Sequence, residues 1–443
     1  AADAVTGAKI ADDQINSEHY VAASIDHEHL SDDCVDGDNI ADNSVGLAAM
    51  AHGTDGNLIT YDASGAPAHV TTGTSGQVLT SNGAGAAPTF QAAASGAIGR
   101  NLLYNGEMQI AQRATSLASS TTSHGYQTVD RWRVNINTGA FTFSQDNESP
   151  NGFSKSLKLD CTTAASAGAA ENISIQQHLE GLDLQGIKAG TADAEALTLS
   201  FWVRATKTGV FNTILYQKDG GKFAVQNTTI SSANTWEKKT FTVSGNTADA
   251  IDNDNTKAFT VEFWLSAGTN YRGGTISGSW NAWADNEAGE GVTLNIADNT
   301  SNDFYITGVK LEMGSSATDY DYQAFQDELR RCQRYYQQVG TPTQDGQFCI
   351  GASHLTSAGD QTRVGYFGQN NLRATPTITE FGDGLRVIGS GSNTPVTSIG
   401  DINVTSGSAY LQFNAECTDI GDDNEIVVVT NTANGGIKIE AEL

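Results

Sequence analysis

Residues 197–204 read LTLSFWVR, and this alternation of apolar and polar side chains decides the fold class. Successive side chains of a β-strand point to opposite faces of the sheet, so every second residue shares a face. The apolar set here is Leu197, Leu199, Phe201 and Val203. A second run, Phe259–Ser266, repeats the pattern with Val261, Phe263 and Leu265. A strand with one apolar face needs a second layer of structure to cover it.

Further alternating runs with turn residues between them extend this pattern over residues 101–322. They are Ser156–Asp160, Ile173–Gln177, Lys238–Val243, Val292–Ile296 and Phe304–Glu312. Several short strands in a row with few helical signals predict an all-β fold, here a β-sandwich of the jelly-roll type.

One helix is predicted after the sandwich, within residues 323–340. An apolar stripe at helical spacing runs along Ala324–Val339, Gly340 suits the position after a helix, and Pro342 follows. Its members are Phe325, Leu329, Cys332, Tyr336 and Val339. Beyond it, residues 341–443 again alternate and predict a C-terminal β tip domain. The strands expected there are Phe348–Ala352, Arg363–Phe367, Thr377–Phe381, Leu385–Ile388, Tyr410–Phe413, Glu425–Val429 and Ile437–Glu440.

Before the sandwich, residues 1–52 repeat a ten-residue unit in which every fifth side chain is apolar. These side chains are Val5, Ile10, Ile15, Tyr20, Ile25, Leu30, Val35, Ile40, Val45 and Met50. A period of five fits neither an α-helix nor a flat strand, and short fixed periods indicate stacked or wound elements. We expect the ten side chains to form the core of an intertwined homotrimeric shaft. Ala1 falls in frame with the repeat, so we expect further repeats or an anchoring domain upstream.

A single-chain pentapeptide β-helix is the alternative for the repeat. That fold also buries the residue two places before each apolar one, and most of these are charged or Asn. Burying such groups without partners costs several kcal/mol each. Ten buried side chains contribute about 15–30 kcal/mol, less than the cost of ordering some fifty residues at about 1–2 kcal/mol each. Sharing the core among three chains therefore fits better than folding alone.

Residues 53–100 are rich in Gly, Ala, Ser and Thr and predict a collar and linker. Two short apolar runs, Leu58–Tyr61 and Gln77–Thr80, indicate hairpins there.

Composition narrows the classes of partner. The net charge is −27, which disfavours nucleic acid and anionic membranes. No apolar run approaches the length that spans a bilayer, so membrane insertion is not expected. Five widely spaced cysteines suggest neither a disulfide framework nor a zinc site, and this fits maturation in a reducing cytoplasm.

Several segments, in order along nearly the whole chain, resemble phage tail fibre proteins. They are Cys34–Asn43 (CVDGDNIADN), Gly73–Gln91, Asn101–Arg113 (NLLYNGEMQIAQR) with Asp130–Trp132, Phe304–Gly314 leading into Asp327–Tyr336, and Leu372–Thr379 (LRATPTIT). The resemblance implies an elongated homotrimeric fibre that is assembled in the host cytoplasm and becomes part of the virion. It also implies attachment to upstream tail proteins and adsorption to a surface glycan or protein of the host.

The loop Tyr271–Gly291 is the candidate receptor site. It is rich in Gly, and its aromatic and planar polar side chains are the mixture that binds sugars. The candidates are Tyr271, Arg272, Trp280, Asn281 and Trp283. The alternative is that the tryptophans fasten a long loop to the sandwich. Trp202 and Trp264 lie on the strand faces opposite the apolar sets; we expect them to be packed beneath a loop or a neighbouring chain, with a sugar platform as the alternative.

The shaft also contains a candidate metal site. His27 and His29 lie on one side of an extended segment, so three chains would bring six imidazole nitrogens together, as an octahedral metal requires. His19 and His29 share their repeat position with Lys9 and Asn39, which indicates a solvated face instead. We expect no other cofactor.

No hydrolase or nucleotide-binding motif occurs, so we expect a structural, receptor-binding protein and not an enzyme. Two alternatives stay open. One is a tailspike that depolymerises polysaccharide, because a pair of carboxylates can meet only in the fold. The other is a secreted adhesin or carbohydrate-binding module.

Overall fold

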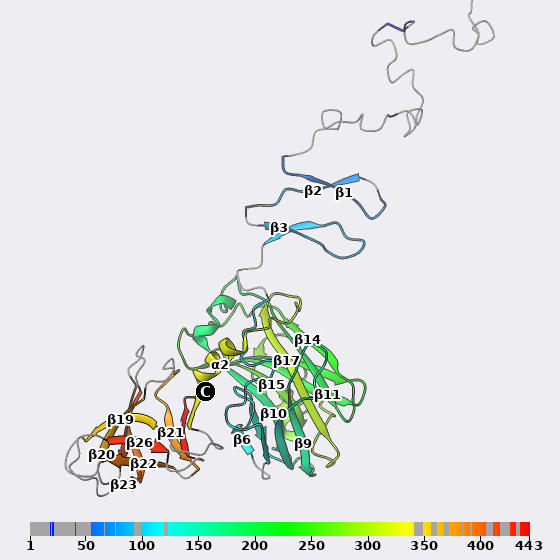
Figure 1. Cartoon of the computed structure of the whole chain (residues 1–443). Coiled ribbons are helices and arrows are strands. Elements are labelled where there is room, and N and C mark those ends of the chain that lie inside the picture. Colours follow the sequence, from blue (N-terminus) through cyan, green and yellow to red (C-terminus); the bar gives the residue numbers. More distant parts are fainter. Residues whose placement is uncertain are drawn as a thin grey trace, which may run out of the picture. The chain divides into compact units, whose positions relative to one another are not determined.

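The computed structural model is all-β apart from a few short helices (Figure 1). It describes residues 18, 20–21, 40, 55–65, 67–75, 77–92, 99–118, 123–340, 349–355, 361–366, 372–382, 384–389, 392–404, 411–416, 426–430 and 435–443. The chain divides into two compact units, residues 1–93 and 94–443. Within the described part, no helix is both long and apolar enough to cross a membrane.

Two large antiparallel sheets dominate the second unit. The first sheet has seven strands, in the order β16 (Asn281–Ala282), β13 (Lys222–Ile230), β12 (Gly209–Gln217), β15 (Lys257–Ala267), β10 (Asn172–Glu180), β7 (Arg133–Ile136) and β6 (Ser123–Tyr126). The second has six, in the order β14 (Glu237–Val243), β11 (Leu197–Ala205), β17 (Asp303–Met313), β9 (Ser156–Thr163), β8 (Ala140–Asp146) and β5 (Ser116–Ala118).

The core lies between these sheets, and the alternation in β11 is confirmed. Every apolar residue of that set is at most 2% exposed and joins one large buried cluster. Phe201 of the six-stranded sheet contacts Phe263 of the seven-stranded sheet edge to face, with ring centroids 4.9 Å apart. Full burial of such a ring contributes about 1.5–3 kcal/mol. The sheets therefore pack face to face, as in a β-sandwich.

The predicted strands are confirmed with one exception. Val292–Ile296 is buried irregular chain and not a strand. Leu294 donates its backbone N–H to the Val210 carbonyl (2.9 Å), so this segment crosses the start of β12 instead of pairing along a strand. Strands β12 and β13 were not predicted, because their sequences, GVFNTILYQ and KFAVQNTTI, do not alternate regularly.

The predicted helix over 324–339 is too long. Helix α2 spans Phe325–Gln333, and the chain then enters strand β18 (Tyr336–Gly340). Phe325 of the expected apolar stripe is 51% exposed, whereas Cys332 is buried. Aromatic and β-branched residues favour a strand, and the extended chain lets Tyr335 and Tyr336 pack against arginines of the sandwich.

The strands predicted after residue 341 are all present, within a few residues of their expected bounds. β18 pairs with β27 (Gly436–Glu440), which also pairs with β21 (Thr377–Phe381). A second sheet has the order β23 (Ser392–Pro395), β22 (Leu385–Gly389), β26 (Ile426–Thr430), β19 (Cys349–Leu355), β20 (Gln361–Tyr366), β25 (Leu411–Glu416) and β24 (Ser398–Val404).

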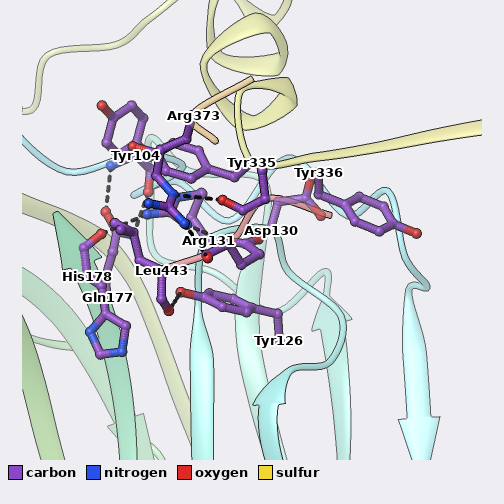
Figure 2. Close-up of polar contacts among 12 residues, drawn as sticks. Tyr104, Tyr126, Asp130, Arg131, Gln177, His178, Tyr335, Tyr336, Arg373 and Leu443 are labelled. Carbon is purple, nitrogen blue, oxygen red and sulfur yellow. Dashed lines mark hydrogen bonds and ion pairs between the residues drawn. The ribbon is translucent and has the colours of Figure 1, made fainter. Parts of the chain in front are cut away.

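A buried arginine joins the end of the chain to the sandwich (Figure 2). Arg131 is fully buried, lies 3.4 Å from the centroid of the Tyr335 ring, and donates to the His178 carbonyl (2.7 Å). Its charge is balanced by an ion pair with Glu442. Tyr126 donates to the Leu443 carbonyl (3.3 Å). Arg131 and its partners therefore have a structural role: they fasten the residues after β27 to the sandwich.

Short helical segments complete the second unit. They are the 3₁₀ turns η5 (Gly181–Asp183), η6 (Gln185–Ile187) and η7 (Thr269–Tyr271) and the single-turn helix α1 (Asp285–Ala288).

The first unit contains two separate hairpins, as expected from residues 53–100. β1 (Leu58–Tyr61) pairs with β2 (Pro67–Val70), and β3 (Gln77–Thr80) pairs with β4 (Thr89–Ala92). Their large apolar side chains are exposed by 43–67%: Leu58, Ile59, Tyr61, Val78 and Leu79. An isolated two-stranded hairpin is at best marginally stable in water.

Candidate functional site

The outer face of the six-stranded sheet carries an open hollow of about 310 Å³. Its walls combine aromatic rings with groups that form hydrogen bonds. The lining residues are Asn151, Phe153, Ser200, Trp202, Lys238, Gly308, Thr318, Asp319, Tyr320 and Tyr322. We call this feature the Trp202 hollow.

The strand pattern explains why Trp202 reaches this face. Its neighbours Phe201 and Val203 point into the core, so the indole points out of the sheet. The pairing of β11 with β17 shifts register between Ser200 and Trp202, at the hollow itself. Bulges of this kind bend a strand and redirect its side chains, and they are common near functional sites.

Gly308 makes room for the opposite wall. It has a φ of +60°, and a Cβ there would lie 2.6 Å from the Phe153 ring. Glycine thus allows both the backbone conformation and the close approach of the ring. Phe153 in turn contacts Tyr320 edge to face (5.1 Å between centroids), and Tyr320 contacts Tyr322 (5.1 Å). Tyr322 is 55% exposed, so it presents a ring to solvent beside Trp202.

A buried ion pair fixes the segment that carries these tyrosines. Lys310 and Glu312 are both 0% exposed, and their charged groups lie 3.2 Å apart. Lys310 donates to the Thr318 hydroxyl and to the Asp319 carbonyl, both at 2.5 Å. Glu312 accepts from the Thr318 backbone N–H (2.8 Å) and hydroxyl (2.6 Å). We call this group the Lys310–Glu312 clamp; it holds one wall of the hollow in a defined position.

This arrangement suits a sugar chemically. Aromatic faces contact the C–H groups of a sugar ring, and the polar side chains around them can bond its hydroxyls. Among the described residues that line the hollow, Asp319 is the only carboxylate. Glycoside cleavage generally uses two carboxyl groups.

The candidate residues of the loop Tyr271–Gly291 are placed against the other sheet, where most are half-buried. Tyr271 contacts Trp264 edge to face, with centroids 5.0 Å apart. The Trp283 ring lies 4.8 Å from Tyr216 and 4.9 Å from Phe223. These rings belong to a second apolar cluster that fastens the loop to the outer face of the seven-stranded sheet.

The remaining loop candidates lie apart from that cluster or carry only local contacts. Trp280 donates its indole N–H to the Ser244 carbonyl (2.7 Å) and packs against the main core. Asn281 donates to the Ser277 hydroxyl, and Arg272 is exposed. Tyr271 and Trp283 thus share one apolar cluster, whereas Trp280 packs against the main core. The role of the five candidates in binding a glycan stays a prediction.

The structure places the side chains of Trp202 and Trp264 in different environments. Trp264 is 4% exposed in the cluster beneath the loop, as expected, and its indole N–H donates to Glu262 (2.7 Å). Trp202 is only half-buried and lines an open hollow. The other aromatic residues that line the hollow belong to the segments NGF (151–153) and DYDY (319–322), which the sequence analysis did not identify as candidates. The one sequence feature that could have indicated them is the occurrence of aromatic beside polar residues in predicted loops.

The shaft predictions lie largely outside the described residues, including the histidine pair His27 and His29. Of the ten predicted core positions only Tyr20 and Ile40 are described, and in the single chain they are 49% and 42% exposed. No group of three or more His, Cys, Asp or Glu residues suited to a metal ion occurs among the residues that the structure describes.

The second unit thus defines the class of the protein as a jelly-roll β-sandwich with an aromatic-lined hollow on one outer face. No protein-family model and no curated protein matches the chain. Among solved structures, the enzymatically active domain of tailspike protein 4 from bacteriophage CBA120 is 13% identical, with a TM-score of 0.27. That match covers 48% of this chain and 21% of the tailspike chain.

Two further similar structures carry sugar-binding descriptions. A putative sugar-binding protein from Bacteroides thetaiotaomicron is 12% identical, with a TM-score of 0.27, and the match covers 48% of this chain and 100% of that one. The carbohydrate-binding module TmCBM61, solved with β-1,4-galactotriose, is 12% identical with a TM-score of 0.24, and the match covers 48% and 99%. At these identities the likeness concerns the fold alone.

Proposed function

We propose that this chain is the receptor-binding part of a trimeric phage tail fibre and that it recognises a host-surface glycan through the Trp202 hollow. The observation that carries the proposal is the open hollow itself, in which Trp202 and the exposed Tyr322 share a surface with polar groups. An aromatic ring left in solvent at a concave surface is typical of ligand recognition.

The polar groups around the rings support recognition of a sugar over a purely apolar ligand. Asn151, Lys238 and Asp319 are exposed at the rim of the hollow. Together they offer hydrogen-bond donors and acceptors to the hydroxyls of a sugar. The Lys310–Glu312 clamp fixes one wall in advance, which lowers the entropy cost of binding.

The exposed apolar side chains of the hairpins support the homotrimer. Leu58, Ile59 and Tyr61 lie on a hairpin that has no partner layer among the described residues of its own chain. Two further copies around a common axis would cover them. Three heads on one fibre would also raise the apparent affinity of a weak sugar site, because the second and third contacts are intramolecular.

The same proposal places the protein in the virion, attached to upstream tail proteins, as a binding component without catalytic activity or a cofactor. The loop Tyr271–Gly291 is the second candidate for the receptor site, because its aromatic rings are only half-buried. A depolymerising tailspike stays as an alternative that the test below separates. A secreted adhesin or carbohydrate-binding module is the other alternative, and a signal peptide or a catalytic domain in the full reading frame would identify it.

The test is binding of the purified full chain to an array of bacterial surface polysaccharides. Trp202→Ala should weaken the binding to a recognised glycan at least tenfold, because it removes the main stacking surface. Trp236→Ala is the matched control: this half-buried tryptophan contacts Tyr305 on the same sheet but does not line the hollow. It should bind normally.

Three results would contradict parts of the proposal. If Trp280→Ala with Trp283→Ala abolishes binding and Trp202→Ala does not, the loop is the receptor site. If the chain binds no polysaccharide on the array, the proposal that it recognises a glycan is wrong. Sustained release of oligosaccharides from a bound polysaccharide would identify a depolymerising enzyme.

A further inference from the structure

The outer face of the seven-stranded sheet carries three cations that form no direct ion pair with a carboxylate among the described residues. They are Arg133 on β7, Lys218 directly after β12, and Lys257 at the start of β15. Other described basic residues, among them Lys155 and Lys222, also form no ion pair, so the informative feature is that these three lie close together.

Strand register places these cations around one patch. Arg133 lies opposite Gln176 on β10, and Gln176 lies opposite Glu262 on β15. Hydrogen bonds follow this row, from Arg133 to Gln176 (3.0 Å) and from Gln176 to Glu262 (3.3 Å). Lys218 donates its backbone N–H to the Ala258 carbonyl (2.8 Å), and this brings it beside Lys257.

The patch has a buried floor and a more exposed, basic rim. On the floor, Gln176, Glu262 and His178 are at most 9% exposed. On the rim, Arg133 and Lys257 are half-buried and Lys218 is exposed. Burial lowers the pKa of Lys257, and the charges of Lys218 and Arg133 lower it further, against the opposite effect of Glu262. The cations are therefore close enough to repel one another. Two carboxylates interact with them, Glu262 with Lys257 and Arg133, and Asp219 with Lys218.

An aromatic ring lies beside this rim. Tyr216 is two residues before Lys218, faces the same side of the sheet, and is half-buried. It lies opposite Thr260, whose hydroxyl contacts His178 (3.1 Å). The patch thus combines three neighbouring positive charges with a ring that can contact the C–H groups of a sugar.

We propose that the face formed by Arg133, Lys218 and Lys257 binds an acidic sugar of a polysaccharide, whose oxyanion pairs with these cations while its ring contacts Tyr216. This site lies on the other sheet from the Trp202 hollow and selects its ligand by charge, so it does not depend on that hollow. Carboxylates of uronic acids and sulfate esters share the required chemistry.

The test measures binding of the full chain to immobilised polygalacturonate, dextran sulfate and neutral dextran. At least one polyanion should bind tenfold or more tightly than dextran, and the one that binds identifies carboxylate, sulfate or either. A net charge of −27 opposes nonspecific attraction of polyanions, so such binding would be local. Equal affinity for all three probes would overturn the proposal.

Variants test whether the preference for polyanions over neutral dextran arises from the patch. Arg133→Gln, Lys218→Gln and Lys257→Gln together should abolish the preference, and Trp202→Ala should keep it. Lys218→Gln alone, at an exposed side chain, should weaken polyanion binding about threefold and keeps the test usable if the triple variant misfolds. The matched control, Lys155→Gln with Lys188→Gln and Lys207→Gln, removes the same charge elsewhere and should bind normally. A loss in this control equal to that in the patch variant would also overturn the proposal.

Discussion

His178 shows how the sandwich holds a titratable side chain at the scale of one residue. It is 4% exposed on β10, and its Nδ1 contacts the Thr260 hydroxyl (3.1 Å). Burial lowers its pKa well below 6.5, and the charges of Lys257, Arg133, Arg131 and Lys218 lower it further. The imidazole is therefore neutral in the folded protein near neutral pH.

This environment predicts a pH-dependent contribution to stability. Below about pH 6.5 the unfolded chain binds a proton at His178 that the folded chain does not. The free energy of unfolding should therefore fall on acidification, by at most about 2 kcal/mol between pH 7 and pH 5 from this residue. His178→Gln, which cannot titrate, should lack that part of the loss. Thermal melts of both proteins across this range check the prediction, and parallel profiles would contradict it.

At the scale of elements, the Lys310–Glu312 clamp connects strand β17 to the wall of the Trp202 hollow. Its two charges are removed from water completely, and the hydroxyl and backbone of Thr318 complete their hydrogen bonds. A buried pair of this kind adds little stability over apolar residues, whereas breaking it leaves an uncompensated charge. We infer that its main effect is to position the segment that carries Tyr320 and Tyr322.

Two variants separate stability from positioning. Lys310→Met should lower the free energy of unfolding by about 3–5 kcal/mol, because it leaves Glu312 buried and unpaired. Lys310→Met with Glu312→Leu should recover most of that loss but should still bind glycan more weakly than the wild type, since the segment is no longer held. Thermal melts and binding curves for both variants measure the two effects. Normal glycan binding by the double variant would show that the clamp does not position the wall.

Sequence patterns predicted the elements better than the surfaces between them. Alternation in β11 and β15 correctly placed Trp202 and Trp264 outside the core, because side-chain direction in a strand is local. Which of the two stays open depends on distant segments: the loop after residue 268 covers Trp264, and residues 314–322 leave Trp202 accessible. The same limit explains β18, which pairs with a strand about a hundred residues away and overrides a helical pattern.

At the scale of the molecule, the two compact units differ in how completely they bury their own apolar side chains. The sandwich buries a large core between its sheets. The hairpins of the first unit expose apolar side chains by up to 67%. The ten-residue repeat predicts that further copies of the chain cover these side chains.

The oligomeric state follows as a prediction. The full chain should have three times the 46.6 kDa mass of one copy in solution, because association of three copies would bury the exposed side chains of the hairpins. Light scattering coupled to size-exclusion chromatography gives this mass directly. A monomer at micromolar concentration would contradict the trimeric shaft.

The most direct test of glycan recognition observes the six tryptophans separately. In a chain labelled with 5-fluorotryptophan, each ¹⁹F resonance can be assigned by a single Trp→Phe substitution. On addition of a bound glycan, the Trp202 resonance should shift, while those of the buried Trp132 and Trp264 should not. A shift confined to Trp280 and Trp283, with Trp202 unchanged, would contradict the assignment of the receptor site to the Trp202 hollow.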